Sequence, residues 1–208
     1  MEKSDRSPAR NGSKPLVAKL GGSLFGHIPE IAPVLAGSPR PLLIVPGGGP
    51  FADTVRLAGV QGDAAHWMAI CAMDQFGWFC SSSGGIPVTT SLQTPQATEI
   101  LLPYEILRKR DPLPHTWDIT SDTIAAWVAA DLGLDLLLIK SVDGILKNGV
   151  FLETVSEPLA TDIVDPCCIP YILKHRASAT VINGTDPSRI ALFLKGEPVP
   201  CTRIGTTF

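Results

Sequence analysis

The chain contains 208 residues, of which 45% are hydrophobic and 18% charged, and its formal net charge is −3. This length fits a single domain with a sizeable core. The charge balance argues against a protein that binds nucleic acid or a membrane surface. No run of about 18 apolar residues predicts a membrane-spanning helix. The charged share lies below the roughly 25% of an average domain, which favours a homodimer or higher homo-oligomer.

Residues 1–14 are polar and lack the apolar segment of a signal peptide, so we predict a flexible tail there. Residues 15–208 are then expected to form one domain. The five cysteines are odd in number and form no Cys-x-x-Cys pair, so neither a zinc site nor a disulfide framework is expected from them. We assign no metal-binding residues, and we predict a cytoplasmic location.

A first apolar run, residues 16–20, predicts a strand, and a glycine loop of Gly21, Gly22 and Ser23 follows it. Adjacent glycines let the backbone approach a ligand closely, and exposed amide groups there suit phosphate oxygens. Lys19 lies on the same strand face as Val17, where a buried ammonium is costly unless it meets an anion. The alternative is a tight turn with Lys19 reaching solvent.

A second strand, residues 42–45, leads into Gly47, Gly48 and Gly49. A lone loop of this kind is more typical of a turn. In an open α/β sheet, however, ligands bind at the carboxyl ends of the strands, so both glycine loops would open onto one crevice. Neither loop matches GxxxxGK[ST] or GxGxxG, which argues against P-loop and dinucleotide-binding enzymes.

The next segment, residues 63–79, predicts a helix that is apolar nearly all round, which favours burial at a subunit interface. The region 81–114 carries five prolines and allows only short elements, such as a helix over 104–109. Residues 121–132 predict a covering helix with Ser121 as N-cap and Gly133 at its end. Asp122, in its first turn, either stabilises the helix dipole or points into the crevice to hold a lysine.

A strand over 135–139 ends at Lys140, and the Asp143-Gly144 turn follows. This is either an ordinary strand exit or a place where Lys140 offers charge to phosphate and the turn touches a nucleotide. A last strand is predicted over 179–182. Strands that are apolar on both faces and alternate with helices predict a three-layer α/β/α sandwich with a mainly parallel open sheet.

Together these segments resemble the amino acid kinase superfamily, which includes acetylglutamate, aspartate, uridylate and isopentenyl phosphate kinases. The resemblance spans nearly the whole chain after residue 14. It rests on an ordered series of motifs: Lys19-x-Gly21-Gly22-Ser23, Gly47-Gly48-Gly49, the Asp118/Asp122 pair, Val142-Asp143-Gly144 and Gly205-Thr206.

This resemblance implies a kinase that uses ATP and Mg²⁺, with the acceptor bound by residues 15–115 and ATP by residues 116–208. It implies catalytic roles for Lys19 and Asp122. The implied nucleotide-binding residues are Gly21, Gly22, Ser23, Lys140, Asp143 and Gly144. The implied acceptor-binding residues are Gly47, Gly48, Gly49, Asp53, Arg56, Asp63 and Asp118. Many members carry a second catalytic lysine in a late segment, but residues 165–174 show no clear match. Lys140 or Lys174 replaces it, or the role is lost.

Within the superfamily, residues 46–53, 63–70, 72–77, 181–184 and 187–189 look most like the aminomethylfuran phosphate kinases of methanofuran biosynthesis. The implied acceptor is a small phosphate monoester that carries an amine. Asp53 or Asp63 would meet the amine and Arg56 the phosphate, unless these are ordinary surface residues. Alternatives are a uridylate kinase, suggested by Asp63 and Met68, an isopentenyl phosphate kinase, and a non-catalytic nucleotide-gated storage module.

Overall fold

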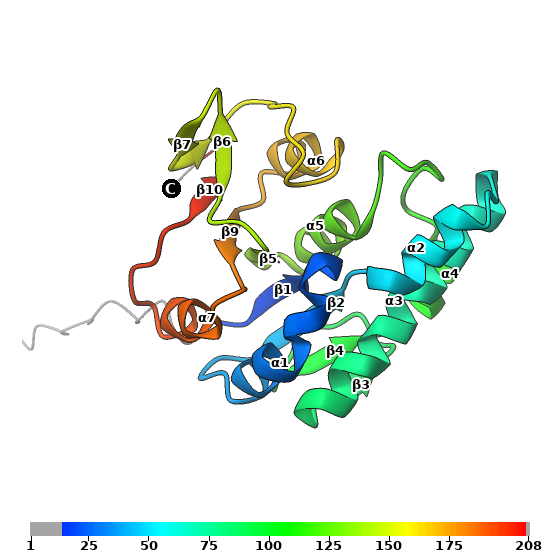
Figure 1. The fold of residues 1–208 in the computed structure, drawn as a ribbon, viewed down its shortest axis with the longest axis horizontal. Coiled ribbons are helices and arrows are strands. Elements are labelled where there is room, and N and C mark those ends of the chain that lie inside the picture. The colour runs from blue at the N-terminus through cyan, green and yellow to red at the C-terminus, as the bar shows by residue number, and fades with distance from the viewer. Residues whose placement is uncertain (1–13, 207–208) are drawn as a thin grey trace, which may run out of the picture.

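An eight-stranded sheet forms the centre of the computed structural model, which describes residues 14–206 (Figure 1). The predicted tail therefore lies outside the described residues, except for Lys14. The strand order is β3-β4-β2-β1-β5-β9-β10-β8. Only the β9–β10 pair is antiparallel, and a separate antiparallel hairpin joins β6 and β7. The prediction of a mainly parallel α/β sheet is confirmed.

The elements follow the predicted alternation of strands and helices. The strands are β1 Leu16–Leu20, β2 Leu42–Pro46, β3 Val88–Thr89, β4 Glu99–Leu101, β5 Leu136–Lys140, β6 Ile145–Lys147, β7 Val150–Leu152, β8 Thr154–Val155, β9 Ala179–Asn183 and β10 Thr202–Ile204. The helices are a short 3₁₀ helix η2 Gly22–His27, α1 Ile28–Ala36, α2 Gly49–Leu57, α3 Gly62–Gly84, α4 Tyr104–Arg110, α5 Ser121–Leu132, α6 Cys168–Lys174 and α7 Pro187–Leu194. Within residues 14–206, none of these helices is long and apolar enough to cross a membrane.

The two faces of the sheet carry separate hydrophobic cores because side chains alternate along each strand. In β1, Leu16, Ala18 and Leu20 belong to the core shared with α1 and α7. Val17 belongs to the core shared with α5 and α6. Figure 1 shows these helix pairs on opposite sides of the sheet. Any residue that alternates with Val17 therefore points toward α5.

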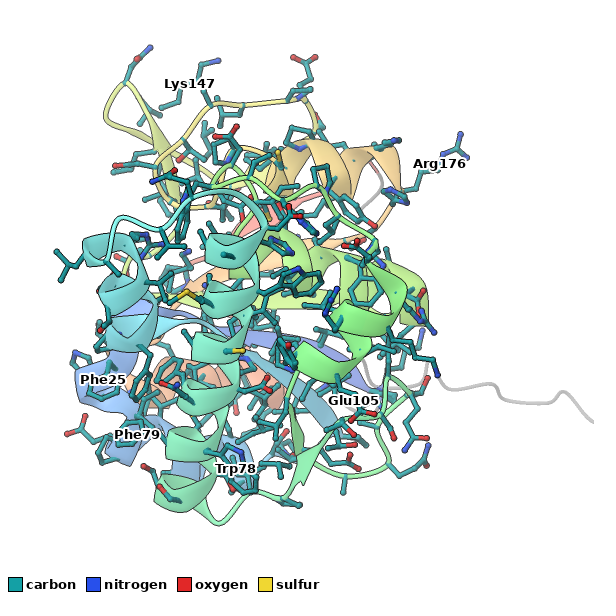
Figure 2. The ribbon with its side chains drawn as sticks, turned by 90° about the vertical axis from the view of Figure 1, so that its right-hand side faces the viewer. Phe25, Trp78, Phe79, Glu105, Lys147 and Arg176 are labelled. Carbon is teal, nitrogen blue, oxygen red and sulfur yellow. The ribbon has the colours of Figure 1, made fainter. Side chains whose placement is uncertain are left out.

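The long helix α3 packs against α1, α2 and α4 at one end of the sheet. It is longer than predicted, and Gly85, with a φ of 63°, ends it in the left-handed conformation that glycine favours. Figure 2 looks onto this helix. Trp78 on its outer face is 57% exposed, and Phe79 stacks on Phe25 with ring centroids 4.6 Å apart. Among residues 14–206, Trp78 is thus left largely uncovered, whereas Phe25 and Phe79 are partly buried against the core.

The start of α5 is held by a carboxylate from far along the chain. The buried Asp165 side chain accepts hydrogen bonds from the backbone amides of Thr120 and Thr123, each at 2.9 Å, and from both threonine hydroxyls. The prediction of Ser121 as the N-cap was wrong, because Thr120 occupies that position. The Thr120 side chain itself makes no capping hydrogen bond. Gly133 ends the helix in the left-handed conformation, as predicted.

Replacing Asp165 by alanine is expected to lower the free energy of unfolding by about 3 kcal/mol, because four donors lose their charged acceptor inside the protein. Urea denaturation measures the change. Asp162→Ala, three residues earlier and exposed, is the matched control and should shift stability by less than about 0.5 kcal/mol. Equal stability of the two variants would contradict this role of Asp165.

A second prediction concerns pH, because burial raises the pKa of Asp74 to about 6 although its carboxylate accepts a bond from the Tyr104 amide at 3.1 Å. The folded state therefore binds a proton more tightly than the unfolded chain, and stability rises as pH falls through about 6. Asp74→Asn should raise stability at pH 8 by about 1 kcal/mol, after allowance for solvent screening of this half-buried group. The variant should also lose the pH-dependent gain. Thermal melts between pH 5 and 8 test this prediction. The control is Glu105→Gln, at an exposed position of α4 (Figure 2), which should keep the rise in stability as the pH falls.

Candidate active site

Three charged side chains meet at the carboxyl ends of β1 and β5, beneath the start of α5. The ammonium group of Lys19 lies 2.7 Å from Oδ1 of Asp122, and that of Lys140 lies 2.9 Å from Oδ2. Lys19 is only 3% exposed and Asp122 only 4%. The structure thus brings both predicted catalytic residues together with a lysine predicted to bind the nucleotide.

Alternation along the strands explains why these residues converge. Val17, Leu136 and Leu138 all face the core shared with α5. Lys19 lies two positions after Val17, and Lys140 two positions after Leu138, so both lysines point to the same face. β1 and β5 are parallel neighbours, with Lys19 beside Leu138. Asp122 lies in the first turn of α5, where the helix dipole favours a carboxylate. The backbone amide of Asp165 also donates to Asp122 at 3.3 Å.

The electrostatics of the cluster favour an ionised Asp122. Burial alone would raise the pKa of Asp122, but Lys19 and Lys140 outweigh it and hold that pKa below its ordinary value. Burial and repulsion from Lys19 lower the pKa of Lys140, against the pull of Asp122. Two ammonium groups face one carboxylate, so one positive charge is not balanced within the cluster. A buried site of this kind attracts an anion such as a phosphoryl group.

The two predicted glycine loops lie directly against each other. A Cβ atom on Gly22 would come within 2.6 Å of the Gly49 amide nitrogen, and one on Gly47 within 2.7 Å of the Gly22 nitrogen. Gly49 also has a φ of 50°, which disfavours other residues. A Cβ on Gly21 would lie 2.9 Å from the Ile139 carbonyl oxygen. These glycines are therefore needed for packing of the loops as well as for any contact with a ligand.

On the predicted nucleotide side, the residues after β5 form a connected network. Ser23 and Ser141 join the first glycine loop to the end of β5 through a hydroxyl contact of 3.2 Å. Asp143 pairs with Arg189 of α7 and accepts a bond from Asn183 at 2.9 Å. These contacts, Asn183 first, lower the pKa of Asp143. Gly144 is buried, and a Cβ there would lie 2.5 Å from the Thr202 hydroxyl oxygen, so its role in the fold is steric.

A cavity of about 410 Å³ lies between the glycine loops, α2, α3 and the start of α5, and Lys19, Asp122 and Lys140 are not among its lining residues. Its walls do include residues within four positions of Lys19 or Asp122 in the sequence: Gly22, Ser23, Thr120 and Ser121. Four residues predicted to bind the acceptor also line it: Gly48, Gly49, Asp53 and Arg56. Its floor is apolar, formed by side chains such as Ile70 and Met73. A small molecule there would contact α2, the glycine loops and the first turn of α5.

The other predicted acceptor residues lie elsewhere. Gly47 packs under the first glycine loop. Asp63 binds His115 at 2.8 Å instead of lining the cavity. Asp118 is exposed and is also absent from the lining. Asp53 and Arg56 pair with each other at 2.6 Å.

The cavity-lining residues that sequence reasoning did not assign include the ring side chains of His66, His115 and Trp117. Arg56 lies over the Trp117 ring, 5.0 Å from its centre. His66 lies one turn after Asp63 on α3, so helical spacing was a usable signal for it. His115 and Trp117 lie just after the proline-rich region 81–114, which gave no periodic pattern. Bonds to Asp63 and Asp111 raise the pKa of His115, whereas burial and then His115 itself lower that of His66.

The two candidates for the second catalytic lysine, Lys140 and Lys174, lie in different surroundings. Lys174 lies exposed in the last turn of α6. Lys140, by contrast, is bound to the same carboxylate as Lys19. The arrangement favours Lys140 for the missing role.

Known proteins resemble this chain in sequence and in fold. No protein-family model matches the chain. The chain is 28% identical over 211 aligned positions to the [5-(aminomethyl)furan-3-yl]methyl phosphate kinase of Methanocaldococcus jannaschii, with 90% of this chain and 96% of the relative covered.

Among solved structures, UMP kinase from Ureaplasma parvum is similar with a TM-score of 0.68 and 16% identity, covering 93% of this chain and 99% of that one. Uridylate kinase from Archaeoglobus fulgidus gives a TM-score of 0.63 and 18% identity, covering 92% of this chain and 100% of that one. An isopentenyl phosphate kinase also gives 0.63, with 16% identity and coverage of 91% of this chain and 100% of that one.

The structural likenesses show a shared fold, and the curated relative, matched over nearly its full length, is a kinase of a small molecule. The predicted resemblance to the amino acid kinase superfamily is confirmed: the chain has the fold of these kinases and is similar over most of its length to a small-molecule kinase.

Proposed function

We propose that this kinase transfers a phosphoryl group from ATP to a small phosphate monoester at the Lys19–Asp122–Lys140 cluster. The observation that carries the proposal is the buried carboxylate shared by two ammonium groups, on a residue next in sequence to Ser121, which lines the cavity. Phosphoryl transfer depends on positioning two ligands and neutralising charge that spreads over the transferred group. Two fixed positive charges supply that neutralisation, and Asp122 keeps both in place.

The proposed roles follow from position. Lys19 and Lys140 stabilise the transferred group, so Lys140 acts in catalysis as well as beside the nucleotide. Asp122 acts as a positioning residue because both of its oxygens are engaged by lysines. Gly21, Gly22 and Ser23 offer backbone and hydroxyl groups to ATP phosphates, and Gly48 and Gly49, at the start of α2, offer amides to the acceptor phosphate.

The described residues fit ATP better than they fit a protein-held magnesium site. The first glycine loop follows a strand and leads into a helix, which is where backbone amides can meet a phosphate chain. The carboxylates of Asp122 and Asp143 are already engaged by cationic side chains. We therefore propose that Mg²⁺ arrives bound to ATP, where it neutralises phosphate charge.

For the acceptor we propose [5-(aminomethyl)furan-3-yl]methyl phosphate, which would be converted to its diphosphate. Support comes from the name of the curated relative and from the cavity, whose 410 Å³ suits a small ligand. Its apolar floor suits a furan ring. The Asp53–Arg56 pair at its wall offers one group of each sign to an acceptor that carries both an amine and a phosphate. UMP is the second candidate, since two uridylate-type kinases share the fold.

The same proposal includes a homo-oligomer built through α3. Trp78 and Met68 on this helix are 57% and 41% exposed, and Phe79, next in sequence to Trp78, stacks on Phe25 (Figure 2). Large exposed aromatic side chains of this kind are typical of protein interfaces.

A coupled ADP-release assay with ATP and Mg²⁺ tests the proposed function. The acceptor panel contains the furan phosphate, UMP, isopentenyl phosphate, acetylglutamate and aspartate. We expect kcat/KM for the furan phosphate to exceed the others at least about tenfold. A preference for UMP would replace the acceptor but keep the class. No turnover with any acceptor, while ATP still raises the melting temperature, would contradict the proposal and favour a nucleotide-gated binding module.

A further inference from the structure

The strongest unexplained feature is a group of histidine and aspartate side chains at the rim of the cavity. His66 comes from α3, whereas Asp111 and His115 come from the segment between α4 and α5. One potential ligand atom from each of these three residues lies within 4.8 Å of the others. The proposed phosphoryl transfer assigns none of them a role.

Both ring nitrogens of His115 face carboxylate oxygens. Nδ1 lies 2.8 Å from Oδ1 of Asp63, and Nε2 lies 2.8 Å from Oδ1 of Asp111. A neutral imidazole carries only one N–H, so it can donate to only one of the two carboxylates. The lone pair of the other nitrogen would then point at a lone pair of the second carboxylate, which is repulsive. One of the two pairs therefore requires a further positive charge, which is either a second proton on the ring or a metal ion.

The surroundings also suit a metal ion that would displace the proton from Nε2. Asp63 on Nδ1 is the kind of carboxylate that commonly orients a metal-binding histidine and fixes its tautomer. The third potential ligand, His66, stands beside His115 with ring centroids 3.9 Å apart. Both histidines also line the cavity, so a metal bound here would keep an open coordination position toward a small molecule.

We infer that His66, Asp111 and His115 bind a divalent transition metal, with Zn²⁺ as the best-matched ion, at the rim of the acceptor cavity. Two imidazoles and one carboxylate suit zinc, whereas magnesium and calcium prefer oxygen ligands alone. The site is built from histidine and aspartate, and so departs from the expectation, based on cysteines, that the chain holds no metal-binding residues.

Metal binding has a geometric consequence that can be observed. The two rings are stacked with an angle of 17° between their planes, and a metal must lie in the plane of each ring that binds it. His66 must therefore turn out of the stack and direct a nitrogen toward Asp111. The ring protons of both histidines should shift strongly in the NMR spectrum when the metal is added.

The experiment measures Zn²⁺ binding to the full chain at pH 8 by competition with a chromogenic chelator, and visible absorption after addition of Co²⁺. We expect one site per chain. His66→Gln should weaken zinc binding at least about tenfold, and should remove the visible absorption typical of tetrahedral Co²⁺. Asp63→Ala should weaken binding about tenfold through loss of the orienting carboxylate. His27→Gln is the matched control and should bind zinc like the wild type. The His27 side chain is 42% exposed, and among residues 14–206 it pairs with Glu30.

Thermal melts without metal show whether each variant is folded, and His66→Gln is the primary variant because His115 holds two ion pairs. Equal zinc affinity of wild type and His66→Gln would overturn the inference. So would the absence of zinc binding by the wild type at micromolar concentrations, which would leave a proton as the charge between His115 and Asp111. Neither outcome bears on ATP-dependent turnover, so the site can fail while the proposed function stands.

Discussion

The Asp122 carboxylate, buried between two ammonium groups, is the interaction on which the rest of the site depends. Burying either lysine alone would cost several kcal/mol, and the cost falls only when an opposite charge is held in place. That requirement fixes the start of α5 over the ends of β1 and β5. Because two positive charges share one negative charge, the cluster remains suited to an anion.

The surrounding structure holds this arrangement rigid. Asp165 anchors the first turn of α5 through Thr120 and Thr123, so Asp122 is fixed by a segment that lies more than 40 residues later. On the other side, the glycine loops interlock backbone to backbone, which sets the distance between the proposed donor and acceptor positions. A catalytic group that is placed before the substrates bind needs less reorganisation during reaction.

Much of this site was predictable because it rests on strand alternation. Lys19 and Lys140 had to face α5, given the apolar residues two positions before each of them, and the glycine loops had to follow their strands. The residues that were missed depend on contacts between distant segments. Asp165, which lies 45 residues after Thr120 in the sequence, caps the helix in place of the expected Ser121. His115 contacts His66 and Asp63 only because the irregular segment before α5 folds back onto α3. Asp63 and Asp118 were assigned to the acceptor from motif position alone, and the cavity walls do not include them.

The most direct test of the account is the turnover number of Lys140→Ala and Lys19→Ala with the best acceptor. Each substitution removes one charge donor to the transferred group, and kcat should fall about a hundredfold or more in both variants. Lys147→Ala, in the exposed hairpin labelled in Figure 2, provides the control and should keep wild-type turnover. Wild-type turnover in folded Lys140→Ala would contradict the claim that two lysines around Asp122 carry out the transfer.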